Sequence, residues 1–234
     1  MDALDRAAGR VLELAPEADL STPVPHLGRW KVRDLIAHLG GVHEWAARIV
    51  TTRSMEGPGA TKSALDGPEL CEWCAAAYHG LREALSTNPV DDPCPNFNPG
   101  SERTVGWWLR RQTHETTVHA WDLERALGGA TTEIEPDVAA DGVDEFLDVF
   151  VRTRGKRTLV APLTLAVTDP ARTWTLTLAD RPGRLEVAPD GPEAGTALIG
   201  PAHAMVLVLW GRLTVAEAGL AVQGDPEVVR SFRP

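Results

Sequence analysis

The sequence has no apolar run approaching the roughly 20 residues that cross a membrane, and it has no repeat or low-complexity tract. Its first residues, MDALDRAAGR, lack the apolar segment of a signal peptide, so we expect a cytoplasmic protein. Positive charge is also scarce, because 23 Lys and Arg residues stand against 33 Asp and Glu residues and give a formal net charge of −10. This balance argues against non-specific binding to nucleic acid or to an anionic membrane, and an anionic substrate would need local arginine residues.

Cysteine is equally scarce. Cys71 and Cys74 form one C-x-x-C motif, and Cys94 stands apart from it. A zinc ribbon needs a second such pair. A thioredoxin-like redox site places the motif after a strand and at the start of a helix, whereas here it lies inside an apparent helix over residues 68–85. We therefore interpret the three cysteines as packing residues.

The first half of the chain indicates a helical domain. Apolar residues recur at helical spacing in four segments, which are residues 3–14, 31–50, 68–85 and 107–127. Proline-rich segments separate some of these helices. Four helices in up-and-down order predict a four-helix bundle, whose core can hold a metal between facing helices.

The second half changes character near residues 128–136. A helix is predicted over residues 136–154, and then the apolar periodicity switches towards two. The segments with this periodicity are residues 158–169, 173–180, 184–189 and 196–200. A helix over residues 202–213 follows, and then a strand and a short helix within residues 218–232. We therefore expect a small α+β domain, with the two domains covering residues 1–132 and 133–234.

The segment HETTVHAWDLE, residues 114–124, is similar to a zinc-protease signature, but its second histidine comes one residue late. His114 and His119 are five residues apart and point to different sides of a helix, whereas Glu115 and His119 share a face. The same stripe continues through Gln112 and Asp122. A carboxylate and an imidazole on one face can supply two metal ligands, and Asp122 can orient one of them. The alternative is a solvated helix face.

A third ligand is available on the second helix, which carries His38 and His43. Leu35 and Val42 flank His38 one turn on either side, so His38 points into the bundle, whereas His43 is expected to point away from it. A buried histidine needs a hydrogen-bond partner or a metal. Two histidines and one carboxylate leave a fourth position open, as in catalytic zinc sites.

Three stretches carry a resemblance to a known family. GRWKVRDLIAHLGGVHEWA, RRQTHETTVHAWDLE and LVLWGRLTVAEAGLAVQGD resemble the second helix, the metal-binding helix and the C-terminal domain of the mycothiol-dependent maleylpyruvate isomerase family. The resemblance covers nearly the whole chain in the right order. It implies a DinB-like metal-binding four-helix bundle followed by a small α+β domain similar to sterol carrier proteins.

The resemblance also implies a set of site residues. The ligands of a divalent metal, zinc above all, would be His38, Glu115 and His119. The family uses a catalytic arginine from its C-terminal domain, and Arg212 is its best match. Arg110 and Arg111 precede the ligands and are candidates for holding the cofactor or a carboxylate substrate. Lys31 replaces the usual Thr or Ser at the start of the second helix, which weakens its cap.

We expect the remaining tryptophans and histidines of interest to have structural roles. Three tryptophans of the fourth helix are expected in the core and the pocket wall: Trp107, Trp108 and Trp121. Four histidines are given no role beyond surface or local packing: His26, His79, His114 and His203.

The function implied is that of an isomerase or S-transferase that uses mycothiol, a thiol made by actinobacteria. A metal-activated thiolate would act on a small electrophile. Two alternatives stay open, a metal-dependent hydrolase and a non-catalytic module that binds a small molecule. The expected partners are the electrophile and the thiol, without nucleic acid or membrane, and the expected state is a monomer or a small homo-oligomer.

Overall fold

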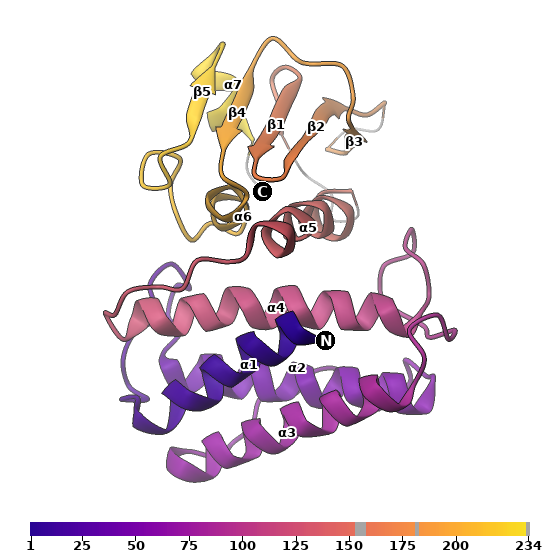
Figure 1. Ribbon diagram of the computed structural model, residues 1–234, viewed down its shortest axis with the longest axis vertical. Helices are drawn as coiled ribbons and strands as arrows, with labels where there is room; N and C mark the ends of the chain where they lie inside the picture. Colours follow the sequence, from indigo (N-terminus) through magenta and orange to yellow (C-terminus); the bar gives the residue numbers. More distant parts are fainter. Residues whose placement is uncertain (153–157, 181–182, 233–234) are drawn as a thin grey trace. The chain divides into compact units, whose positions relative to one another are not determined.

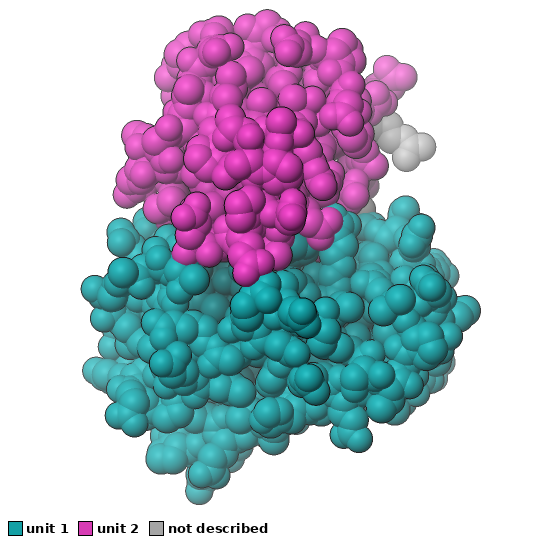
Figure 2. All heavy atoms as spheres, viewed as in Figure 1, with its two compact units in different colours: residues 1–132 teal, residues 133–234 magenta. Residues whose placement is uncertain are grey.

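A computed structural model of the chain describes residues 1–152, 158–180 and 183–232. The chain forms two compact units, residues 1–132 and 133–234 (Figure 2). The first unit is helical and the second combines a sheet with short helices (Figure 1). This arrangement confirms the predicted helical bundle followed by a small α+β domain.

The first unit is a bundle of four long helices. They are α1 (Asp2–Leu14), α2 (Val32–Thr52), α3 (Gly67–Thr87) and α4 (Val105–Ala126), with a short 3₁₀ turn, Ala15–Glu17, after α1. Helix α2 packs against both α3 and α4, and α1 packs against α4 (Figure 1). Helix α2 is therefore covered by neighbours on more than one side.

The apolar stripe of α2 forms the centre of the bundle core. Leu35, Leu39 and Val42 of this helix are buried together with Leu70 of α3 and Leu123 of α4. Burying each leucine side chain contributes about 1.5–3 kcal/mol relative to leaving it in water. This packing fixes the facing surfaces of α2 and α4, where the polar stripe described below also lies.

Helices α2 and α4 begin with different caps. Lys31 precedes α2, and its side chain makes no capping hydrogen bond, because an ammonium group has no acceptor. The carboxylate of Asp34 instead accepts a hydrogen bond of 3.0 Å from the Lys31 backbone N–H. Thr104 precedes α4, and its hydroxyl accepts a hydrogen bond of 3.2 Å from the backbone N–H of Trp107. Helix α2 thus has half of a capping box, and α4 has a conventional threonine cap.

The second unit is built on a five-stranded sheet with the strand order β3-β2-β1-β4-β5. The strands are β1 (Leu163–Thr168), β2 (Ala171–Leu178), β3 (Leu185–Pro189), β4 (Ala197–Gly200) and β5 (Ala221–Gln223). Strand β1 pairs in parallel with β4, and all other pairs are antiparallel. Leu163, Leu165 and Val167 alternate along β1 and are buried. This alternation is the period-two pattern visible in the sequence.

Short helices complete the second unit. They are α5 (Pro136–Phe146), which continues into a π-helical turn (Leu147–Val151), α6 (Ala202–Leu209) and α7 (Pro226–Ser231). Helix α6 packs against α5 and contacts β1 and β4. The end of the helix predicted over residues 136–154 lies outside the described residues. Across residues 1–152, 158–180 and 183–232, every helix is too short or too polar to act as a membrane span.

The contact between α2 and α3 requires a residue without a side chain at Gly40. A Cβ atom there would lie 2.2 Å from the Trp73 ring of α3, far inside van der Waals contact. Gly80, in the exposed part of α3, has no atom within 4 Å of the corresponding Cβ position. The two glycines therefore form a matched pair for measuring the packing between α2 and α3.

We expect Gly40→Ala to lower the free energy of unfolding by about 1–3 kcal/mol, because the added methyl group overpacks the contact between α2 and α3. Gly80→Ala should instead raise it by up to about 1 kcal/mol through the better helix propensity of alanine. Urea denaturation followed by circular dichroism measures both changes. Equal effects of the two substitutions would contradict the close contact at Gly40.

Candidate metal centre

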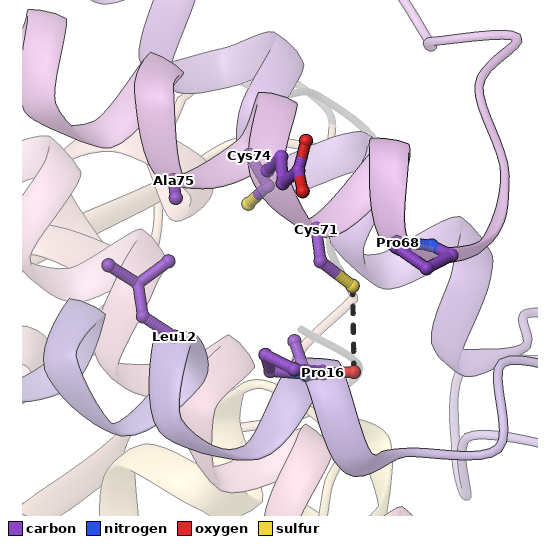
Figure 3. Close-up of a pocket in the computed structure, with 8 residues that line it drawn as sticks. Leu12, Pro16, Pro68, Cys71, Cys74 and Ala75 are labelled. Carbon is purple, nitrogen blue, oxygen red and sulfur yellow. Dashed lines mark hydrogen bonds between the residues drawn. The ribbon is translucent and has the colours of Figure 1, made fainter.

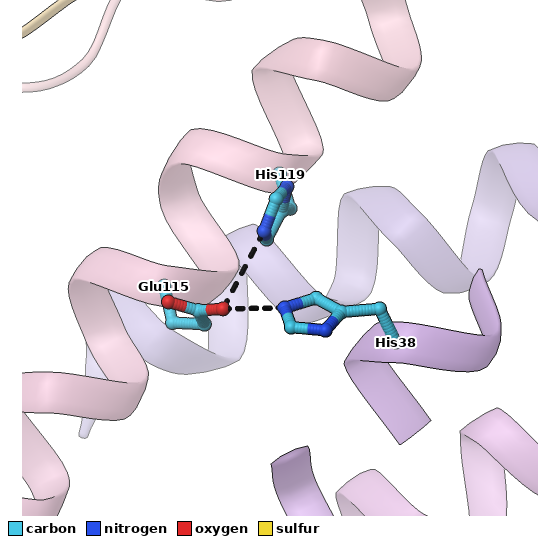
Figure 4. Close-up of side chains that lie close together, drawn as sticks. All are labelled: His38, Glu115 and His119. Carbon is cyan, nitrogen blue, oxygen red and sulfur yellow. Dashed lines mark hydrogen bonds and ion pairs between the residues drawn. The ribbon is translucent and has the colours of Figure 1, made fainter. Parts of the chain in front are cut away.

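Three side chains from two helices converge inside the bundle. His38 comes from α2, and Glu115 and His119 come from successive turns of α4 (Figure 4). One potential ligand atom from each of the three lies within 4.8 Å of the others. The Glu115 Oε1 atom lies 2.7 Å from His38 Nε2 and 3.4 Å from His119 Nε2. Two imidazole nitrogens thus face one carboxylate oxygen across the seam between α2 and α4.

The outer atoms of two of these side chains are held by neighbours. Asp122 Oδ2 lies 2.9 Å from His119 Nδ1, so Nδ1 carries a hydrogen and donates it to the carboxylate. The second oxygen of Glu115 accepts a hydrogen bond from the Arg111 guanidinium. A carboxylate that holds the outer nitrogen fixes the orientation of a ligating imidazole. Asp122 therefore orients His119, as one of the two sequence interpretations expected.

The polar stripe of α4 is not a solvated helix face. The exposed fractions of Gln112, His119 and Asp122 are 2%, 7% and 1%. The side chains of Glu115 and His38 remain 17% and 25% exposed. The cluster is therefore enclosed by protein on most sides and keeps an opening near His38 and Glu115.

The charges of the cluster stabilise one another. Burial alone would raise the pKa of Glu115, but the charge of Arg111 and the bonds to His119 and His38 hold this pKa well below its usual value. Burial would likewise lower the pKa of His119, but its bonds to Asp122 and Glu115 outweigh burial and raise the pKa to about 9. In the metal-free protein, His119 is therefore protonated at neutral pH and Glu115 is ionised.

His43 departs from the sequence prediction. It was expected to point away from the bundle interior, but its exposed fraction is 2%, and its Nε2 atom lies 2.9 Å from the hydroxyl oxygen of Thr116 on α4. Burial lowers the pKa of His43 to about 4, so this side chain is neutral at physiological pH. The expectation was wrong because α2 has packed neighbours on two sides.

One neighbour of the cluster could not be found from helical spacing. Trp30 precedes α2, and its ring centroid lies 5.0 Å from that of His38 and 6.0 Å from that of His119. Its ring is nearly parallel to the His119 ring, at an interplanar angle of 19°. The only sequence signal is its place two residues before α2, because a loop residue has no periodic pattern that predicts its direction.

The structure places the three candidate arginines differently. Arg111 is buried and belongs to the cluster through its ion pair with Glu115. Arg110 is half-buried on α4. Arg212 lies in the second unit, after α6, where its Nη1 donates a hydrogen bond of 2.7 Å to the backbone oxygen of Trp210. Arg111 thus contacts one of the three candidate ligands directly.

The cysteines lie outside this cluster. Cys71 and Cys74 line a cavity of about 310 Å³ between the end of α1 and the start of α3 (Figure 3). The Cys71 thiol donates a hydrogen bond of 3.5 Å to the backbone oxygen of Ala15. Burial raises the pKa of Cys71, and it raises that of Cys74 to about 12. Burial also raises the pKa of Cys94. Thiols with raised pKa values are poor nucleophiles, which agrees with a packing role.

The donor set suits a divalent metal of the zinc class. Imidazole nitrogen and carboxylate oxygen are ordinary zinc ligands, and three protein ligands with one open position are typical of catalytic sites. The residues also provide the outer hydrogen bond to a ligating imidazole that such sites need. His38, Glu115 and His119 are therefore candidate ligands for a divalent metal.

The chain is a helical bundle with a partly buried His-Glu-His cluster, joined to a small mixed sheet domain. Residues 1–124 match the family profile described as the mycothiol maleylpyruvate isomerase N-terminal domain. Residues 137–231 match the profile of the C-terminal domain of the same family. The chain belongs to the mycothiol-dependent maleylpyruvate isomerase family.

Solved structures share the fold. A mycothiol-dependent maleylpyruvate isomerase in which one histidine is replaced by alanine is 14% identical, with a TM-score of 0.66 over 94% of this chain and 90% of the other. A second structure of a mycothiol-dependent maleylpyruvate isomerase is also 14% identical, with a TM-score of 0.65 over 91% and 88%. No curated protein sequence matches the chain.

We expect zinc binding to the metal-free protein to release a proton from His119 at neutral pH, because its pKa is raised to about 9 and a ligating imidazole must be neutral. The apparent zinc affinity should therefore rise with pH, by about tenfold per unit, until the pH reaches this pKa. Calorimetric titration in buffers of different ionisation enthalpy measures both quantities.

Asp122→Asn is the matched control for this titration. Removing the charge next to His119 should reduce the proton release and weaken zinc binding by about 10- to 100-fold. A zinc affinity of the wild-type protein that is independent of pH over this range would contradict the raised pKa of His119.

Proposed function

We propose that this protein is a metal- and mycothiol-dependent cytoplasmic enzyme that acts on a small electrophile as an isomerase or S-transferase. The observation that carries the proposal is the convergence of His38, Glu115 and His119 within 4.8 Å inside the bundle. Membership of the mycothiol-dependent maleylpyruvate isomerase family supports the choice of thiol. Arg212 is the proposed catalytic arginine, and Arg110 and Arg111 are the proposed cofactor-binding arginines.

The side chains of the cluster have separable tasks. Two histidines and one carboxylate supply a single negative charge to the metal, so the centre retains a net positive charge that attracts a thiolate. Asp122 keeps the His119 ring oriented through its Nδ1 atom. Arg111 holds the outer oxygen of Glu115 and keeps the carboxylate ionised. When bound, zinc lowers the pKa of a coordinated thiol, so that a thiolate is available near neutral pH to add to an electron-poor double bond.

The nucleophilic thiol has to come from outside the chain. The three cysteines have pKa values raised by burial, and none of them belongs to the cluster. A small thiol that enters through the opening near His38 meets this need. If the thiol is released after rotation about the former double bond, the reaction is an isomerisation. If the thiol adduct is released, the reaction is an S-transfer.

The two alternatives fit the side chains less well. A metal-dependent hydrolase needs a base that is not a ligand. Glu115, which contacts both imidazoles, is itself a proposed ligand, and Asp122 is hydrogen-bonded to the outer nitrogen of His119. A carrier of apolar molecules has no use for a partly buried carboxylate between two imidazoles, which costs free energy unless it is paired or binds a metal. Both observations favour the thiol-dependent enzyme.

Metal content tests the ligand assignment. We expect about one zinc ion per chain in protein purified without a histidine tag, and a loss of that zinc in Glu115→Ala and in His119→Ala. His79→Ala is the matched control, because His79 is exposed on α3. Mass spectrometry measures the metal, and circular dichroism verifies that the variants fold. Unchanged zinc content in the two ligand variants would show that the assignment is wrong.

Thiol dependence tests the reaction. We expect consumption of maleylpyruvate, or of another electron-poor cis alkene, only when both mycothiol and the metal are present. Chelation should abolish turnover, and added zinc should restore it. Mass spectrometry of the product distinguishes a trans isomer without the thiol from a thiol adduct. Turnover that needs the metal but no thiol would instead favour the hydrolase.

A further inference from the structure

Residues 54–66, called the strap here, connect α2 to α3 and run back along α2. Near the end of α2, the Arg48 guanidinium donates hydrogen bonds to the backbone oxygens of Glu56 and, at 3.0 Å, of Pro58. Near the start of α2, the Arg33 guanidinium donates a hydrogen bond of 2.8 Å to the backbone oxygen of Leu65. The strap is therefore fastened at both ends along the length of α2.

The middle of the strap passes close to one of the proposed ligands. A Cβ atom on Gly41 would lie 2.1 Å from the backbone oxygen of Thr61, so the strap approaches α2 closely where this helix has no side chain. Gly41 follows His38 by three residues, and residues three apart are neighbours on a helix surface. Thr61 and the residue after it therefore lie beside the flank of α2 that carries His38.

Lys62 follows Thr61 and brings a positive charge to this flank. Its Nζ atom lies 5.1 Å from the centroid of the Trp30 ring, and the same ring lies 5.0 Å from His38. The distance from the Lys62 ammonium group to the His38 imidazole therefore cannot exceed the sum of these two distances. A small organic molecule can span such a distance. Lys62 is exposed, and no carboxylate of the described residues forms an ion pair with it.

A positive charge next to the cluster favours the binding of an anion to this protein. The chain carries a formal net charge of −10, which repels an anion at long range. Arg111, the arginine that contacts the cluster, already forms an ion pair with Glu115. Lys62 is therefore a cation beside the opening of the cluster whose charge is available to a ligand.

We propose that Lys62 is a specificity-determining residue that binds a carboxylate of an anionic electrophile at the mouth of the candidate metal centre. This inference rests on the proposed function, because it assumes that the electrophile approaches the His38–Glu115–His119 cluster. The Trp30 ring lies next to both the ammonium group and the imidazoles, and the strap determines where that ammonium group lies.

Equilibrium binding of two small probes tests the inference without any turnover. Succinate carries two carboxylates, and succinamide has the same carbon chain without charge. In calorimetric titrations of the zinc-loaded protein, Lys62→Met should weaken succinate binding by about tenfold and leave succinamide binding unchanged, as expected for the loss of one charged hydrogen bond. Lys62→Arg should restore most of the loss.

Lys31→Met is the matched control for the change in net charge. Lys31 is an exposed lysine of the same unit, and its charge acts on Asp19. This variant should bind succinate like the wild type. Wild-type protein that does not bind succinate, or a Lys62→Met variant that binds it as tightly as wild type, would overturn the proposal. An equal loss for succinamide would also overturn it, because Lys62 would then act only by holding Trp30 in place.

Kinetics separates this inference from the proposed function. With mycothiol, Lys62→Met should raise KM for a carboxylate-bearing electrophile by about tenfold and change kcat/KM little for its neutral amide. Thiol-dependent turnover with equal losses for both substrates would refute the role of Lys62 and leave the proposed function intact. Absence of thiol-dependent turnover in the wild type would refute the proposed function, while the succinate titration would still decide the role of Lys62.

Discussion

The carboxylate of Glu115 is the interaction on which the centre of the bundle depends. One of its oxygens faces the nitrogens of His38 and His119, and the other accepts a hydrogen bond from Arg111. A carboxylate in this partly buried position is stable only when its charge is matched by partners. Because His38 belongs to α2 and the other partners belong to α4, the same group also joins the two helices.

The candidate metal centre of this bundle thus lies in the seam between two helices. The apolar residues around it fix the approach of α2 and α4, and the polar cluster occupies a gap in that apolar packing. Asp122 and Arg111 belong to α4, like two of the three proposed ligands. Helix α4 therefore supplies most side chains of the centre, and α2 adds one imidazole.

Helical spacing accounts for the proximity of the three side chains in this cluster. Glu115 and His119 are four residues apart on one helix, and His38 lies beside an apolar stripe, so the 3.6-residue period was enough to bring them together. The same helical period predicted the wrong direction for the His43 side chain. A direction away from one apolar stripe is a direction into solvent only when a helix has one packed side, and α2 packs against both α3 and α4.

Segments without a period escaped prediction. Trp30 and Lys62 lie in loops, and their approach to the centre depends on hydrogen bonds and close contacts that no spacing rule describes. In the second unit, alternation located β1, but the strand begins only at Leu163. Pro162, just before it, has no N–H to donate, which agrees with the position of prolines at the start of strands.

The fastening of the strap has a consequence for how such a site can change over time. Arg33 and Arg48 bind backbone oxygens of the strap, and every residue type offers the same backbone oxygen. Apart from Asp66, whose carboxylate lies 3.5 Å from the Arg33 guanidinium, the contacts that hold the strap to these two arginines do not depend on its side chains. Substitution at a position such as 62 alters the charge presented to a ligand, while the proposed metal ligands and the bundle core stay as they are. The residues that determine ligand selectivity are thus different from those that hold the fold. Single substitutions can therefore adapt one bundle to new electrophiles.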